Sequence, residues 1–136
     1  MKVFIADDSA LVCERIIGML TELPEIEIAG QARDVHEAIE SINKSKPDVV
    51  ILDIRMPGGS GIEVLKNIKK DKSAPLVIML TNYPYPQYRK KCIDEGADFF
   101  FDKSTEFGKL VEVLKKLFQE SRFSMPLKIM KGRKEI

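Results

Sequence analysis

Residues 49–57 constrain the fold of this chain more than any other stretch. Four aliphatic residues, Val49–Leu52, run directly into the carboxylate of Asp53, and a Met-Pro-Gly-Gly turn follows. A short apolar run between turn residues is typical of a strand buried on both faces, as in a parallel sheet. The sequence therefore predicts that Asp53 ends an interior strand, at the edge where open α/β sheets bind their ligands.

Short apolar runs alternate with helical patterns along the whole chain. The runs lie at residues 2–6, 25–30, 48–52, 76–80 and 97–101. Apolar residues at helical spacing lie between Ser9 and Pro24, between Asp34 and Pro47, after Gly61, over residues 87–95, and from Phe107 to Phe118. This alternation predicts an α/β fold with a five-stranded parallel sheet and five helices on both faces. The run at 25–30 alternates charged and apolar residues, as a half-exposed edge strand does.

The composition is that of an ordinary globular protein. The 136 residues suffice for one domain, with 44% apolar and 32% charged residues. Apolar runs are far shorter than the ~20 residues of a membrane span, and no signal peptide is recognisable, so we expect a cytoplasmic protein without a membrane partner. In that compartment Cys13 and Cys92 are expected to be reduced packing thiols.

The charge is unevenly distributed. Residues 122–136 hold five basic residues and one acidic residue, whereas the chain as a whole carries +1. We expect one domain over residues 1–121 and a basic, solvated tail over 122–136. This tail is too short for a helix-turn-helix unit, so we expect neither an output domain nor nucleic-acid binding.

Chemically distinctive side chains follow four of the predicted strands. Asp7 and Asp8 follow the first strand, Asp53 the third, Thr81 the fourth and Lys103 the fifth. In a parallel sheet these positions share one edge. Three clustered carboxylates repel each other unless a cation offsets their charge, and oxygen ligands favour a hard ion such as Mg²⁺.

This pattern resembles the receiver domain of two-component response regulators, at the level of stand-alone, CheY-like chemotaxis regulators. The residues that carry the resemblance are Asp7-Asp8, Asp53-Ile54-Arg55-Met56-Pro57 with Gly61, Thr81 and Lys103. It covers about residues 1–120 and implies a flavodoxin-like sheet with the strand order 2-1-3-4-5.

The resemblance implies a phosphoacceptor role for Asp53, with a histidine kinase, a phosphotransfer protein or a small phosphodonor as the source. Lys103 would pair with the phosphoryl oxygens, or with Asp53 before transfer, and Thr81 would donate its hydroxyl to the phosphoryl group. For Mg²⁺ it implies direct ligation by Asp8, Asp53 and the main-chain carbonyl of Arg55. Asp7 would act mainly through a metal-bound water.

The resemblance also implies a switch. Phosphorylation would draw Thr81 inward and leave space for an aromatic residue on the fifth strand, which Phe100 matches by position. The face made by the fourth helix, fifth strand and fifth helix would then change its affinity for a downstream partner, which the sequence does not identify, or for a second copy in a homodimer. Phe100 lacks the hydroxyl of the tyrosine common at this position, so an inward state held by that hydroxyl is not expected.

Three residues depart from the usual receiver pattern or flank its site. Ser104 replaces the proline that usually follows the lysine, and a non-proline cis bond costs about 3–4 kcal/mol, so the geometry of the Lys103–Ser104 bond is open. Asn82 replaces a small residue after the threonine, where it could restrict access. Arg55 could project over the site and influence dephosphorylation.

Two other functions compete with the phosphorylation switch. One is a receiver-like interaction or dimerisation module that works without phosphate. The other is an Mg²⁺-dependent phosphatase with an aspartate nucleophile, an enzyme class that usually has a second aspartate two residues later and a cap domain. Arg55 stands at that second position. We therefore expect a signalling domain whose only catalysis is its own phosphorylation and dephosphorylation.

Overall fold

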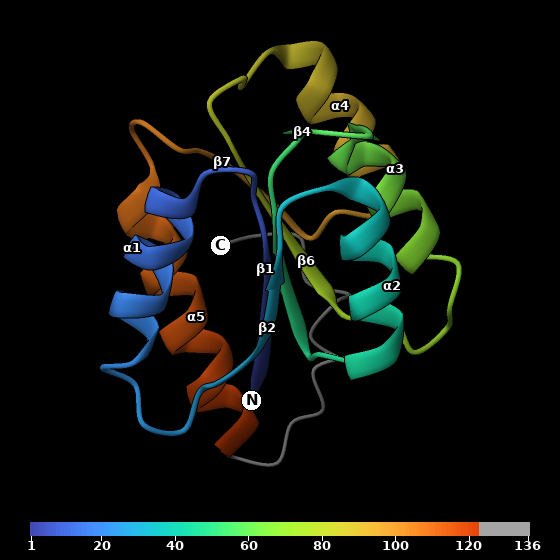
Figure 1. Ribbon diagram of the computed structural model, residues 1–136. Coiled ribbons are helices and arrows are strands. Elements are labelled where there is room, and N and C mark those ends of the chain that lie inside the picture. Colours follow the sequence, from blue (N-terminus) through green and yellow to red (C-terminus); the bar gives the residue numbers. More distant parts are fainter. Residues whose placement is uncertain (123–136) are drawn as a thin grey trace.

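A five-stranded parallel sheet forms the centre of the protein (Figure 1). The computed structural model describes residues 1–122, so nearly all of the tail predicted over 122–136 lies outside the described residues. The strands are β1 (Lys2–Ala6), β2 (Glu27–Ala32), β3 (Val49–Leu52), β6 (Leu76–Thr81) and β7 (Phe99–Asp102). Their order in the sheet is β2-β1-β3-β6-β7, which confirms the predicted order 2-1-3-4-5.

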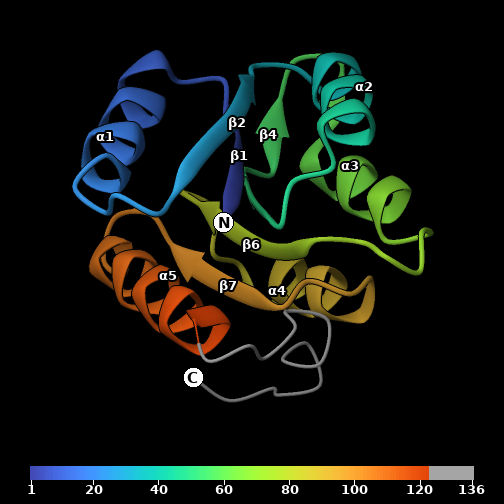
Figure 2. The same cartoon turned by 90° about the horizontal axis from the view of Figure 1, so that it is seen from below.

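Helices cover both faces of this sheet, as predicted. They are α1 (Ala10–Leu20), α2 (Val35–Ser45), α3 (Gly61–Ile68), α4 (Pro86–Asp94) and α5 (Phe107–Arg122). Viewed from below, α1 and α5 lie on one face, and α2, α3 and α4 lie on the other (Figure 2). Among the described residues, no helix combines the length and apolar character that crossing a membrane requires.

The central strand β3 is buried on both faces. Val49 and Ile51 pack with the side chains of α1 and α5, whereas Val50 and Leu52 pack with those of α2 and α3. Burying each such side chain contributes about 1.5–3 kcal/mol, so these four residues fix both the face and the register of the strand. The prediction of a doubly covered strand leading into Asp53 is confirmed.

Polar side chains cap the starts of α1 and α2. The Ser9 hydroxyl accepts a hydrogen bond from the Val12 N–H, and Asp34 accepts one from the Glu37 N–H. Each cap satisfies a helix N–H that has no partner within its helix, and each fixes where its loop ends.

The predicted boundary between the first helix and the second strand was wrong. Helix α1 ends at Leu20, and residues 21–26 form turns, with Leu23 N–H bonded to the Leu20 carbonyl and Ile26 N–H to that of Leu23. Strand β2 starts only at Glu27 because its pairing with β1 begins at Lys2. Apolar spacing continued past the last helical turn, so it could not locate this end.

The turn predicted after Asp53 lies within a short hairpin. Strands β4 (Arg55–Met56) and β5 (Gly59–Ser60) pair antiparallel and lead into α3. The first residue of α3, Gly61, packs directly against the carbonyl of Asp53, where a side chain would clash. The glycine thus lets the hairpin close tightly behind Asp53.

Candidate functional site

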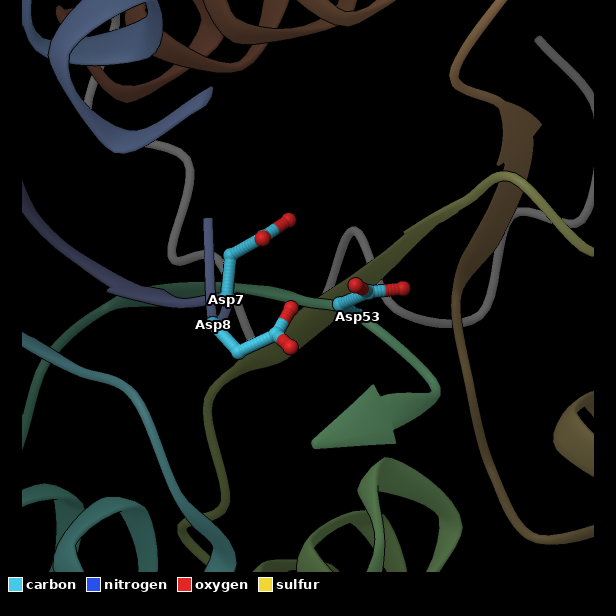
Figure 3. Close-up of side chains that lie close together, drawn as sticks. All are labelled: Asp7, Asp8 and Asp53. Carbon is cyan, nitrogen blue, oxygen red and sulfur yellow. The ribbon is translucent and has the colours of Figure 1, made fainter. Parts of the chain in front are cut away.

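Three aspartates converge at the carboxyl edge of the sheet (Figure 3). Asp7 and Asp8 follow β1, and Asp53 follows the neighbouring strand β3. One carboxylate oxygen from each residue lies within 4.8 Å of the others. Asp7 and Asp53 are only 3% and 5% exposed, whereas Asp8 faces solvent. The structure therefore confirms that these residues cluster, with two buried carboxylates and one at the surface.

Lys103, which follows β7, brings a positive charge into the cluster. Its Nζ atom lies 2.7 Å from Asp7 Oδ2 and 3.3 Å from Asp53 Oδ2. Burial opposes its charge, but the hydrogen bond to Asp7 and the charges of Asp53 and Asp7 raise the pKa of Lys103 above its ordinary 10.5. The predicted pairing with Asp53 is present, together with a shorter contact to Asp7 that the sequence did not indicate.

The Asp53 carboxyl is in an environment that disfavours its charge. Burial raises its pKa above 3.8, and the negative charge of Asp7 adds to this, while Lys103 opposes both. The Ile54 N–H also donates a hydrogen bond of 2.7 Å to Oδ1 of Asp53. An added cation beside this carboxylate would restore the balance of charge.

The donor set of the cluster fits a hard divalent cation. Three carboxylates supply oxygen atoms, and the exposed position of Asp8 leaves one side open to water. Mg²⁺ takes oxygen ligands and retains several waters, which matches a half-open site with few protein ligands. The hairpin strand that carries Arg55 begins two residues after Asp53, so its main chain lies next to the cluster in the sequence.

Thr81 ends β6, and its side chain is fully buried. Its Oγ1 accepts a hydrogen bond of 3.0 Å from the Tyr83 N–H, and its carbonyl accepts one of 2.7 Å from the Lys103 N–H. A hydroxyl that accepts one bond retains its own proton for donation. Asn82 follows at an exposed bend.

Ser104 stabilises the loop after β7 without the proline that receivers usually have there. Its N–H and its hydroxyl both donate to Oδ1 of Asp102, at 2.9 and 2.7 Å. The described residues contain no cis peptide bond, so the Lys103–Ser104 bond is trans. The question left open by the sequence is thereby answered.

Two cation–π contacts near the site were not predicted. The Arg55 guanidinium stacks on the ring of Tyr83 at 4.0 Å, and that of Arg89 covers the ring of Phe100 at 4.7 Å. Phe100 is buried, as its position on β7 suggested. The arginine and the aromatic residue of each pair lie on different segments of the fold, so no local pattern could have linked them.

An open pocket adjoins the acidic cluster. Its volume is about 470 Å³, and its lining includes Asp8, Arg55, Ser60 and Tyr88 of α4. The pocket offers space for a second molecule at the solvent side of the carboxylates.

The comparisons with known proteins agree in one family. A family model described as response regulator receiver domain matches residues 3–115. The chain is 30% identical over 128 residues to the sensory transduction protein LytT of Bacillus anthracis, covering 94% of this chain and 51% of that protein. It thus spans about half the length of this curated relative.

Solved structures with the same fold include two with closely similar TM-scores. The response regulator domain of Thermotoga maritima CheB superposes with a TM-score of 0.76 at 31% identity, covering 88% of this chain and 94% of that one. CheY of Borrelia burgdorferi, solved as a CheX-CheY-BeF3-Mg+2 complex, gives 0.78 at 29% identity, covering 87% and 89%. The CheY-like, flavodoxin-like fold implied by the resemblance is confirmed.

Proposed function

Because the chain belongs to the response regulator receiver domains, we propose that it is a signalling switch that accepts a phosphoryl group on Asp53. The donor is the phosphohistidine of a histidine kinase or phosphotransfer protein, or a small phosphodonor. The observation that carries this proposal is the buried Asp53 carboxylate beside Asp7 and Asp8, with the Lys103 ammonium 3.3 Å away.

In the proposed transfer, an oxygen of ionised Asp53 attacks the phosphorus atom. A new O–P bond forms while the P–N bond of phosphohistidine breaks, and its electron pair stays on the imidazole nitrogen. Lys103 stands where it can pair with the phosphoryl oxygens, and the buried Thr81 hydroxyl has a proton to donate to them. The product is an acyl phosphate.

We propose that Mg²⁺ is the cofactor. Asp8, Asp53 and the main-chain carbonyl of Arg55 would hold it, with Asp7 acting through a bound water. When bound, the ion supplies positive charge that offsets the phosphoryl and carboxylate oxygens. The exposed Asp8 and the adjoining pocket give both the ion and the phosphodonor a route from solvent.

The output of the proposed switch is the face formed by α4, β7 and α5. Movement of Thr81 toward the phosphoryl group would shift Phe100 and α4 toward the active form of this face. The face would then bind a downstream protein or a second copy of the chain. We further propose that the chain acts in the cytoplasm, where thiols stay reduced; Cys13 and Cys92 are both free and buried.

The test is the intact mass of the protein after incubation with acetyl phosphate. We expect a gain of one phosphoryl group that needs Mg²⁺, disappears with a chelator, and is absent in Asp53→Asn. Asp94→Asn, at an exposed aspartate paired with Lys90, is the matched control and should be phosphorylated normally.

Two outcomes would replace the proposal. No mass gain, together with no binding of beryllofluoride, would indicate an interaction module that works without phosphate. Sustained release of phosphate from a phosphate monoester, without a stable adduct, would indicate a phosphatase.

A further inference from the structure

Arg89 lies over the aromatic ring of Phe100. The guanidinium carbon, on α4, is 4.7 Å from the ring centroid, within the ~6 Å range of a cation–π contact. The two residues differ in burial, since Phe100 is 3% exposed and Arg89 is exposed. The arginine therefore covers the solvent side of a ring that is otherwise enclosed by the core.

Phe100 lies on the same face of the sheet as Thr81. Strand β7 pairs with β6 so that Phe100 is opposite Met79, and Asp102 is opposite Thr81. Residues two apart on a strand share a face, so Phe100 lies on the same face as Met79 and Thr81. Its ring packs in the core cluster that also contains Cys92 of α4.

The loop that holds Lys103 is bonded to the end of β7 through Glu106. Glu106, at the end of this loop, accepts a hydrogen bond of 2.9 Å from the Asp102 N–H. This bond and the Lys109 ammonium are the main causes that lower the pKa of Glu106, and the positive charge of Arg89 adds to them. Strand β7, whose Phe100 contacts Arg89, ends at Asp102, directly before Lys103.

We propose that Arg89 is a positioning residue that keeps Phe100 buried and thereby couples α4 to β7, the strand that ends directly before Lys103. A phenylalanine has no hydroxyl with which to anchor itself in the inward position, and the guanidinium provides the anchor from α4 instead. The proposal rests on the proposed function for its consequence: without Arg89, the arrangement that receives the phosphoryl group is less populated.

The first experiment tests the contact and does not depend on phosphorylation. It is a double-mutant cycle of Arg89→Met and Phe100→Leu, measured by urea unfolding. A cation–π contact of this kind is expected to change the folding equilibrium constant about two- to five-fold. Arg89→Met should lower the folding equilibrium constant by this factor when Phe100 is present. It should leave the constant unchanged when residue 100 is leucine. Lys90→Met, on the same helix, is the control. It should change the folding equilibrium constant by the same factor in the protein with Phe100 and in the Phe100→Leu variant.

The second experiment tests the coupling by titrating the same variants with beryllofluoride in Mg²⁺. Arg89→Met is expected to weaken binding about two- to five-fold, Arg89→Lys to restore part of the loss, and Lys90→Met to have no effect. If the losses in unfolding free energy of Arg89→Met and Phe100→Leu simply add in the double variant, the proposal is overturned. Coupled unfolding with unchanged beryllofluoride affinity would also overturn it, because the contact would then be structural only.

The two experiments separate this proposal from the proposed function. If the wild-type chain binds no beryllofluoride and gains no phosphoryl group, the proposed function fails. In that case the positioning role in phosphorylation fails with it, while the unfolding cycle still decides whether Arg89 holds Phe100.

Discussion

Lys103 and Asp7, 96 residues apart in the chain, form an ion pair of 2.7 Å that is shorter than the 3.3 Å contact of Lys103 with Asp53. Both aspartates are nearly fully buried. A single ammonium thus offsets two buried carboxylates. It lies nearer to Asp7 than to Asp53, the proposed phosphoacceptor. The cluster retains excess negative charge until a cation binds or Asp53 takes up a proton.

Asp53→Asn is therefore expected to stabilise the metal-free protein at neutral pH, by about 1 kcal/mol. Burial raises the pKa of Asp53 above 3.8, with a further contribution from Asp7. A raised folded-state pKa means that Asp53 favours folding below pH 3.8 and that this benefit is lost as the pH rises through the folded value. Asparagine stays neutral and can donate to a neighbouring carboxylate.

Urea unfolding across pH 3–8 without Mg²⁺ measures this effect. The gain of Asp53→Asn over wild type should grow as the pH rises, and added Mg²⁺ should stabilise the wild type more than the variant. Asp94→Asn, at an exposed position, should show no such gain. A less stable Asp53→Asn protein at pH 7 would contradict the prediction.

Lys103→Met is expected to destabilise the protein by about 3 kcal/mol, because it leaves two buried carboxylates without their cation. The Lys103 side chain is only 9% exposed. Mg²⁺ should recover part of the loss. Lys109→Met removes an exposed pair with Glu106 and should cost less than about 1 kcal/mol. Equal losses in the two variants, measured by urea unfolding, would show that Lys103 does not have this role.

The sequence was sufficient to predict the sheet because hydrophobic runs and strand ends are local patterns. Val49–Leu52 is apolar at every position, and a strand of this kind needs cover on both faces. Patterns of this kind do not encode the partner of a strand. Strand β2 begins at Glu27 because that residue pairs with Lys2, and the hairpin at Arg55–Met56 forms because Gly61 admits the carbonyl of Asp53.

The site was predictable to the same extent. That Asp7, Asp53 and Lys103 meet follows from strand order, since each follows a strand of the same parallel sheet. Which carboxylate is nearer to Lys103 depends on side-chain distances of a few tenths of an ångström. The cover that Arg89 provides for Phe100 depends on how α4 packs, which no residue spacing specifies.

Ser104→Ala is expected to raise the pKa of Asp102 toward its ordinary 3.8. The Ser104 hydroxyl and then its N–H are the main causes that lower the pKa of Asp102. Because a lowered pKa stabilises the fold above pH 3.8 and the benefit is lost as the pH falls through the folded value, the variant should lose less stability in acid. Carboxyl carbon-13 titration by NMR measures the shift.

The matched control for this titration is Ser73→Ala. Ser73 donates the same two bonds, from its N–H and its hydroxyl, to Oδ1 of Asp71. It should leave the titration of Asp102 unchanged. An Asp102 titration that is the same in Ser104→Ala and wild type would show that the serine does not hold this loop.

Arg55→Ala and Tyr83→Ala are each expected to shorten the lifetime of the proposed acyl phosphate about two- to five-fold. The stacked pair, 4.0 Å apart, joins the hairpin after Asp53 to the segment after Thr81. We expect it to hinder the approach of water between these two segments. Since both variants open the same cover, the double variant should lose its phosphoryl group no faster than either single variant.

Release of phosphate from the purified phosphoprotein gives the half-life. Arg15→Ala removes a similar stack, on Phe107 at 3.9 Å between α1 and α5, and should not change it. An Arg55→Ala half-life equal to that of wild type would mean that the stack does not control access of water to Asp53.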